Sequence, residues 1–120
     1  MPMNSTLAQR LAALAGFLAV ALGAFGAHGL QPLLEKKGTL SVWHTAALYH
    51  LVHAVVLLVL AQKGAVARLP FALFGAGIVI FSGSLYALAL TNVKWLGAIT
   101  PLGGACLLGG WLALAWKPRL

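Results

Sequence analysis

The chain carries little charge and almost no acid. Only 8% of its 120 residues are charged, and one acidic residue, Glu35, stands against eight Lys and Arg. A catalytic site in which a carboxylate orients a histidine is therefore disfavoured, as is a metal site that uses carboxylate ligands. The one cysteine, Cys106, cannot form an intramolecular disulfide. These shortages point away from an enzyme.

Polar residues in general are too few to cover a soluble protein. Hydrophobic residues make up 62% of the chain, and the mean hydropathy is +0.97. Four stretches of 22 to 25 residues contain no charged side chain, and about 20 helical residues cross a hydrocarbon core roughly 30 Å thick. The stretches do not alternate as membrane strands do. We predict an all-α integral membrane protein, a four-helix bundle with up-down-up-down topology.

The whole chain, residues 1–120, is expected to form a single transmembrane domain. We place the four spans at about residues 8–30, 43–62, 69–91 and 95–116. The connection from Gln31 to Ser41 is expected to hold a short interfacial turn that stops at Gly38, and the later connections are short. Short connections make successive spans antiparallel neighbours.

The cations are divided unevenly between the two sides of the membrane. An even number of spans places both termini on one side, with five cations against three on the other. The five are Arg10, Lys63, Arg68, Lys117 and Arg119, and the three are Lys36, Lys37 and Lys94. The positive-inside rule then predicts a plasma (inner) membrane protein with both termini in the cytoplasm. The tryptophans expected at the membrane interfaces are Trp43, Trp95 and Trp116.

Small residues recur every fourth position on two spans. The rows are Ala15, Ala19 and Gly23 on the first span, and Ala105, Gly109 and Ala113 on the fourth. Such rows let helices approach closely in lipid. Packing within one subunit is the interpretation we place first, and self-association through an outward row is the alternative.

Pro101 allows two descriptions of the fourth span. Inside a helix it leaves the carbonyl of Gly97 without its amide partner. In the first helical turn it is harmless, with Thr100 as the capping residue and a bent entry before it.

Polar side chains are expected to gather at one depth. Antiparallel threading places all four histidines in the non-cytoplasmic leaflet. Helical geometry points His44 toward the headgroups, and it points Ser84 away from the other polar residues of its span. The predicted polar cluster consists of His28, Tyr49, His50, His53, Ser82, Tyr86 and Thr100. We expect His28 and His53 to face the bundle interior, because a polar ring facing lipid is costly.

Three roles are open to this cluster. Neutral hydrogen bonding between helices comes first, a site for a solute, a lipid or protons second, and a metal or haem last. Metal is demoted because no acid lies in a span and Cys106 is not spaced with the histidines. Haem ligation by His28 with His50 or His53 is supported by no motif. We predict no cofactor, no metal and no catalytic residue.

The positive charge does not indicate nucleic acid. The cations are scattered among loops and ends, whereas a nucleic-acid site gathers them on one face. Anionic lipid headgroups are the plainer partner. A second copy of the chain or another membrane protein remains open as a further partner.

Several short motifs follow one another in a familiar order. They occupy Gly23 to Gly29, Trp43 to Ala54, Phe81 to Tyr86, Thr100 to Gly104, and Gly110 with Trp111. In this the chain resembles the YgdD/YwdK-type family of small membrane proteins of unknown function. The resemblance implies a four-span protein of the bacterial inner membrane, with relatives in eukaryotic membranes, and it implies no established reaction.

The resemblance also bears on single residues. The positions that match the family are His28, Tyr49, His53, Ser82, Ser84, Tyr86, Thr100 and Pro101. His50 departs from it, because other members can have Gln there. A hydrogen-bonding role, which Gln can share, suits this position better than metal ligation.

Two functions follow as expectations. The first is a non-enzymatic interaction or accessory module, or a lipid-contacting one, because the chain is small and almost wholly apolar. The alternative is a small oligomeric transporter or channel-like protein that uses the polar cluster for a solute or protons. A water path to the cytoplasmic side would favour transport, and a sealed inner half would favour the accessory role.

Overall fold

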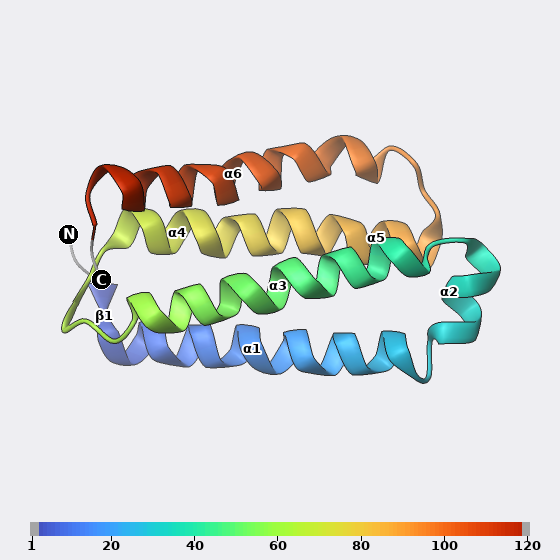
Figure 1. Cartoon of the computed structure of the whole chain (residues 1–120), viewed down its shortest axis with the longest axis horizontal. Coiled ribbons are helices and arrows are strands. Elements are labelled where there is room, and N and C mark those ends of the chain that lie inside the picture. The colour runs from blue at the N-terminus through green and yellow to red at the C-terminus, as the bar shows by residue number, and fades with distance from the viewer. Residues whose placement is uncertain (1–2, 119–120) are drawn as a thin grey trace.

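The computed structural model describes residues 3–118. Four long helices lie side by side, and each is long and apolar enough to cross a membrane (Figure 1). The elements are β1 (Met3–Asn4), α1 (Ser5–Ala27), α2 (Gln31–Lys37), α3 (Leu40–Leu60), β2 (Ala65–Val66), α4 (Arg68–Gly77), the π-helix η1 (Ile78–Ser82), α5 (Gly83–Thr91) and α6 (Leu96–Trp116). Because α4, η1 and α5 form one span, the predicted all-α bundle with up-down-up-down topology is confirmed.

The four spans form an elongated array with two inner and two outer members. In Figure 1, α3 and the α4–η1–α5 span lie between α1 and α6. The array extends 46 × 26 × 18 Å along its principal axes, so its cross-section is flattened, with 26 Å in one direction and 18 Å in the other. A third of the most apolar window of each inner span is buried, against 17% for α1 and for α6. The outer helices therefore turn most of their side chains toward lipid.

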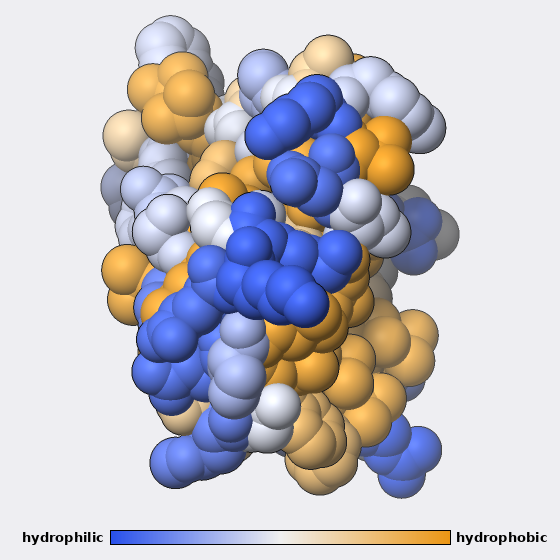
Figure 2. Space-filling model, turned by 90° about the vertical axis from the view of Figure 1, so that its right-hand side faces the viewer, coloured by the Kyte–Doolittle hydropathy of each residue, from blue (hydrophilic) through white to orange (hydrophobic). Residues whose placement is uncertain are grey.

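The two ends of the bundle are built differently. At the end where the described chain starts and finishes, here called the terminal end, β1 pairs antiparallel with β2, with Met3 opposite Val66. The other end, the α2 end, carries the short helix α2 where a short interfacial turn was expected, and the helix stops at Gly38, which has a φ of 72°. Figure 2 views the α2 end, where hydrophilic residues gather across the face and hydrophobic residues lie exposed around and between them. The exposed charged residues there include Glu35, Lys36 and Lys94.

The fourth span corrects one description of Pro101. Helix α6 begins at Leu96 and continues through Pro101, so the interpretation with Thr100 as the capping residue is wrong. The residues before the proline already form tight turns, with the Ala98 amide donating to the Trp95 carbonyl at 2.9 Å. Because the helix has already begun before the proline, Pro101 removes only one hydrogen bond from it, the one that the Gly97 carbonyl would accept.

Trp43 is a core residue and not an interfacial anchor. Its side chain is 1% exposed, and its indole N–H donates to the Leu22 carbonyl at 2.8 Å. Gly26 makes room for the ring, because a Cβ there would overlap the indole. Trp95 and Trp116 are 65% and 91% exposed at their helix ends, as expected of interfacial tryptophans.

Helix α6 packs very close to the third span at the π-helix η1. A Cβ at Gly103 would overlap the backbone nitrogen of Phe81 in η1, so glycine alone permits this approach. The face of α6 that packs inward is Gly103, Leu107 and Gly110. The predicted row on α6 is therefore not its packing face, and Ala105 is exposed. On α1 the predicted row is placed correctly, with Ala19 buried and Gly23 facing Ala47 of α3.

Candidate functional site

His50 joins the two inner spans. It lies at the middle of α3, it is 5% exposed, and its Nδ1 is 2.9 Å from the hydroxyl of Tyr86 on α5. One turn earlier, the Ser82 hydroxyl donates to the Ala46 carbonyl at 2.8 Å. Three residues of the predicted cluster thus connect α3 to η1 and α5.

His53 is held by hydrogen bonds at both ring nitrogens. Its Nδ1 lies 2.7 Å from the Tyr49 carbonyl, one turn back on α3. The indole N–H of Trp111 on α6 donates to its Nε2 at 3.1 Å. Because a carbonyl only accepts and an indole N–H only donates, the arrangement requires the uncharged ring with its proton on Nδ1. A second proton on Nε2 would break the bond to Trp111.

Trp111 belongs to this site, although the sequence pattern predicted no role for it. Its ring packs edge-on against His53, with centroids 5.9 Å apart, and against Phe74, with centroids 5.3 Å apart. The available signal was the Gly110–Trp111 motif. A Cβ at Gly110 would lie 2.7 Å from a ring carbon of Phe74, so the small residue next to Trp111 lets the three rings meet.

Ser84 and Thr100 form a pair of their own. Their hydroxyl oxygens are 2.6 Å apart and connect α5 to α6. Thr100 was expected among the histidines, and this expectation is wrong. The third span lies between two neighbours, so Ser82 faces α3 while Ser84, on the opposite side, faces α6. Thr100, on α6, therefore meets Ser84 and not the histidines of α3.

His28 lies outside the cluster. The prediction that it faces the interior is wrong, because α1 ends at Ala27 and the His28 side chain is exposed at the α2 end. Its backbone amide caps the helix by donating to the Ala24 and Phe25 carbonyls. His44 is exposed as expected.

The polar residues do not share one depth. At about 1.5 Å per residue, His53 lies roughly 10 Å from the Leu60 end of α3, past the middle of the span. Tyr86 lies on the other side of the middle, toward the α2 end. The hydrogen bonds therefore place members of the predicted cluster in separate groups: His50 bonds to Tyr86, His53 to Trp111, and Thr100 to Ser84.

Tyr49, like His28, is an exposed member of the predicted cluster. Its side chain is 43% exposed, and its ring packs against Phe81 with centroids 4.9 Å apart. Tyr49 and His53 line a lateral groove of about 290 Å³ between α3 and α6. Within residues 3–118, no three His, Cys, Asp or Glu side chains come together as a metal site would require.

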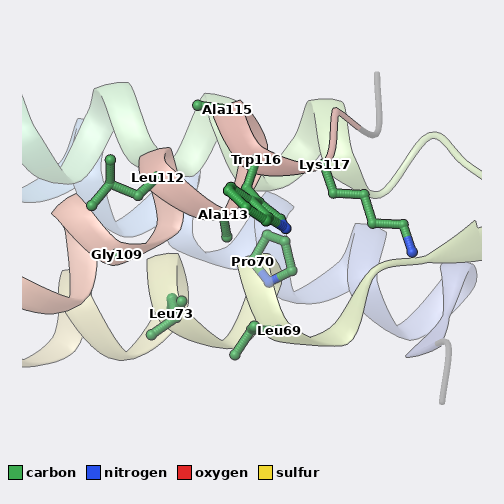
Figure 3. A pocket seen from close by; sticks show the side chains of 9 residues that line it. All are labelled: Leu69, Pro70, Leu73, Gly109, Leu112, Ala113, Ala115, Trp116 and Lys117. Carbon is green, nitrogen blue, oxygen red and sulfur yellow. The ribbon is translucent and has the colours of Figure 1, made fainter.

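A larger groove lies between α4 and α6 at the terminal end. Its volume is about 660 Å³. Figure 3 shows its walls, with Trp116 over Pro70 and the Lys117 side chain extending toward the end of the bundle. We call it the α4–α6 groove, and its lining residues are Leu69, Pro70, Leu73, Gly109, Leu112, Ala113, Ala115, Trp116 and Lys117.

Comparison with known proteins places these features in a family. A family model described as "Protein of unknown function (DUF423)" matches residues 22–104. The UPF0382 membrane protein YwdK of Bacillus subtilis is 49% identical over 111 residues, covering 87% of this chain and 89% of the relative. A UPF0382 membrane protein of Staphylococcus epidermidis is 46% identical over 108 residues, covering 87% and 88%. One of Haemophilus influenzae is 44% identical over 110 residues, covering 88% of each chain. No solved structure matches the chain.

Proposed function

Because the chain belongs to this family of membrane proteins of unknown function, which brings no reaction with it, we propose a role from the geometry: a non-enzymatic accessory module that contacts lipids and membrane partners through its sides. The match covers the segment from the end of α1 to the first turns of α6, including His50, His53 and Tyr86 but not Trp111. The family resemblance expected from the motifs is confirmed.

The observation that supports this role is the apolar interior at the terminal end. In residues 3–118, the buried polar side chains are Thr39, His50, His53, Ser82 and Ser84. Beyond His53 the core toward the terminal end contains Leu57, Leu60, Val66 and Phe71. A path for protons or a polar solute needs polar groups or water across the whole membrane. A sealed half of this kind favours the accessory role over transport.

The hydrogen bonding of the histidines also supports this role. Both nitrogens of His53 are occupied by groups of the protein, and His50 is bound to Tyr86. The bonds to Tyr86 and Trp111 each join two spans, and the bond to the Tyr49 carbonyl lies within α3; joining spans is what neutral polar residues do between membrane helices. On this proposal the two histidines hold the bundle together and transfer no proton across the membrane.

Flux measurements on the reconstituted protein test this role. We expect proteoliposomes with the full chain to leak protons no faster than empty vesicles, with an entrapped pH-sensitive dye as the readout. The variant His53→Gln, folded normally, should behave in the same way. A proton flux that needs the protein and disappears in His53→Gln would favour the transport alternative and overturn the proposal.

We also propose that the terminal end faces the cytoplasm of the plasma (inner) membrane. Arg10, Lys63, Arg68 and Lys117 lie at this end, and Arg119, counted from the sequence, lies outside the described residues. Single cysteines at Lys36 and Lys63, in a Cys106→Ala background, can be labelled in intact cells with an impermeant maleimide. We expect labelling at position 36 alone. Labelling at position 63 alone would reverse the orientation.

A further inference from the structure

We propose that the α4–α6 groove is a binding site for one anionic phospholipid of the leaflet at the terminal end. This inference rests on the proposed lipid-contacting function and names the lipid class and the site. The acyl chain would lie in the groove, and the phosphate would meet the cations at its mouth. Three properties of the groove support this occupant: its shape, its charge and its position along the span.

The shape of the groove suits a flexible hydrocarbon chain. At about 660 Å³ it exceeds the lateral grooves of about 370 Å³ beside His50 and about 290 Å³ beside His53. Its space comes from small residues on α6. A Cβ added at Gly109 would lie 3.6 Å from Leu73, so larger side chains at these positions would fill the groove. Leucines of both helices form the walls (Figure 3).

The charge at the mouth of the groove is complementary to a phosphate. Lys117 follows Trp116 on α6, and Arg68 precedes Leu69 at the start of α4, so both walls lead to an exposed cation. The one acidic side chain of the chain, Glu35, lies at the α2 end, on the opposite side of the membrane. No acidic side chain of this chain can therefore neutralise the two cations, whereas anionic headgroups are attracted to such sites.

The position of the groove matches the boundary between acyl chains and headgroups. Trp116 is 91% exposed at the last turn of α6, as an interfacial anchor is. Leu112, one turn deeper, is 70% exposed and faces the hydrocarbon. An acyl chain that passes Leu112 therefore brings its headgroup to the level of Trp116 and Lys117. A neutral partner helix or a second copy of the chain could use the apolar walls. A neutral helix offers no anion to the two cations, and the acidic side chain of a second copy in the same orientation lies at the α2 end.

Native mass spectrometry of the purified full chain tests the site. The protein is exchanged into mild detergent with either phosphatidylglycerol or phosphatidylcholine of identical acyl chains. We expect one phosphatidylglycerol to be retained per chain, and much less phosphatidylcholine. Lys117→Gln should weaken retention about fivefold, the effect expected for losing one cation near an anionic headgroup, and Arg68→Gln should act similarly. Ala113→Leu, which fills the groove without changing its charge, should weaken the retention of both lipids.

Matched controls separate the site from general attraction to the membrane. Lys36→Gln and Lys94→Gln each remove one exposed cation at the α2 end and should leave retention unchanged. The melting temperature of each variant is measured first, and Lys117→Gln keeps the test valid even where Ala113→Leu does not fold. Equal retention of the two lipids, or equal loss in the control variants, would overturn the inference. A dimer without bound lipid would also overturn it, in favour of a second copy.

The outcomes are distinct from those that test the proposed function. Proton flux through the protein would refute the accessory role, whatever lipid is bound. Indifference to the headgroup would refute this site and leave a sealed, non-transporting bundle intact.

Discussion

Gly103 and Gly104 are adjacent, yet the structure predicts opposite results when each is replaced by alanine. A Cβ at Gly103 would overlap the Phe81 nitrogen and lie 2.7 Å from its Cα and 2.8 Å from the Ile80 carbonyl carbon. All three are backbone atoms of η1, so no side-chain rotation relieves the contact, and α6 has to move. A Cβ at Gly104 would lie 3.7 Å from the Phe81 ring, which is an ordinary contact.

The magnitudes follow from these distances. Forcing an extra methyl group into a packed interface costs about 1–3 kcal/mol, and backbone contacts place Gly103→Ala in the upper half of that range. Alanine is favoured over glycine in a helix by roughly 0.5–1 kcal/mol, which offsets part of this cost. We therefore expect Gly103→Ala to lower the free energy of unfolding by about 1–2.5 kcal/mol, and Gly104→Ala to leave it unchanged or raise it slightly.

Equilibrium unfolding in mixed micelles, with increasing fractions of a denaturing detergent, measures the difference. Far-UV circular dichroism reports helix content, and Trp fluorescence reports packing. The two variants have the same composition, so a difference between them isolates the contact with η1. Equal stability of the two would show that α6 does not approach η1 as closely as described, and the reasoning would be refuted.

Three further predictions concern the histidine site, a turn and bound metal. In a double-mutant cycle of His53→Ala and Trp111→Phe, we expect a coupling of about 0.6 kcal/mol, with about 1.7 as an upper value; additive effects would show that the 3.1 Å bond contributes nothing. Gly38→Ala should lower the melting temperature, because Gly38 has a φ of 72°, whereas Gly29→Ala, where a Cβ meets no atom within 4 Å, should not. Protein isolated under native conditions should carry no stoichiometric transition metal by elemental analysis and no haem absorbance; either one would contradict the prediction.

The relative directions of side chains around one helix could be predicted from the sequence, but the helix that each face contacts could not. The wheel placed Ser84 opposite Ser82, and in the structure the two do face opposite ways. The third span has α3 on one side and α6 on the other, so the Ser84 face is also buried. For the same reason Thr100 of α6 pairs with Ser84 and not with the histidines of α3. Burial on two faces is a property of the assembled bundle and leaves no trace in the sequence of one helix.

Two residues were misplaced or missed because their positions depend on where a helix ends, for His28, and on a long side chain that contacts another span, for Trp111. His28 left the cluster because α1 ends at Ala27, earlier than the apolar stretch suggested. Trp111 entered the site because its indole extends from α6 to His53, across helices whose relative depth is set by packing. The π-helix of residues 78–82, where Gly103 allows close approach, was not anticipated either.

Hydropathy alone determined the class of the protein, its four spans and, because four is an even number, that the described chain starts and finishes at the same end of the bundle. These properties depend on the transfer of apolar side chains into lipid and on the need of the backbone to bond within a helix, and both act residue by residue. Tertiary structure alone decided that the polar residues bond in separate groups, that His53 is bound at both nitrogens, and that a groove opens between α4 and α6. These depend on rotation, depth and contact between helices, which small residues such as Gly103 and Gly110 set by allowing close approach.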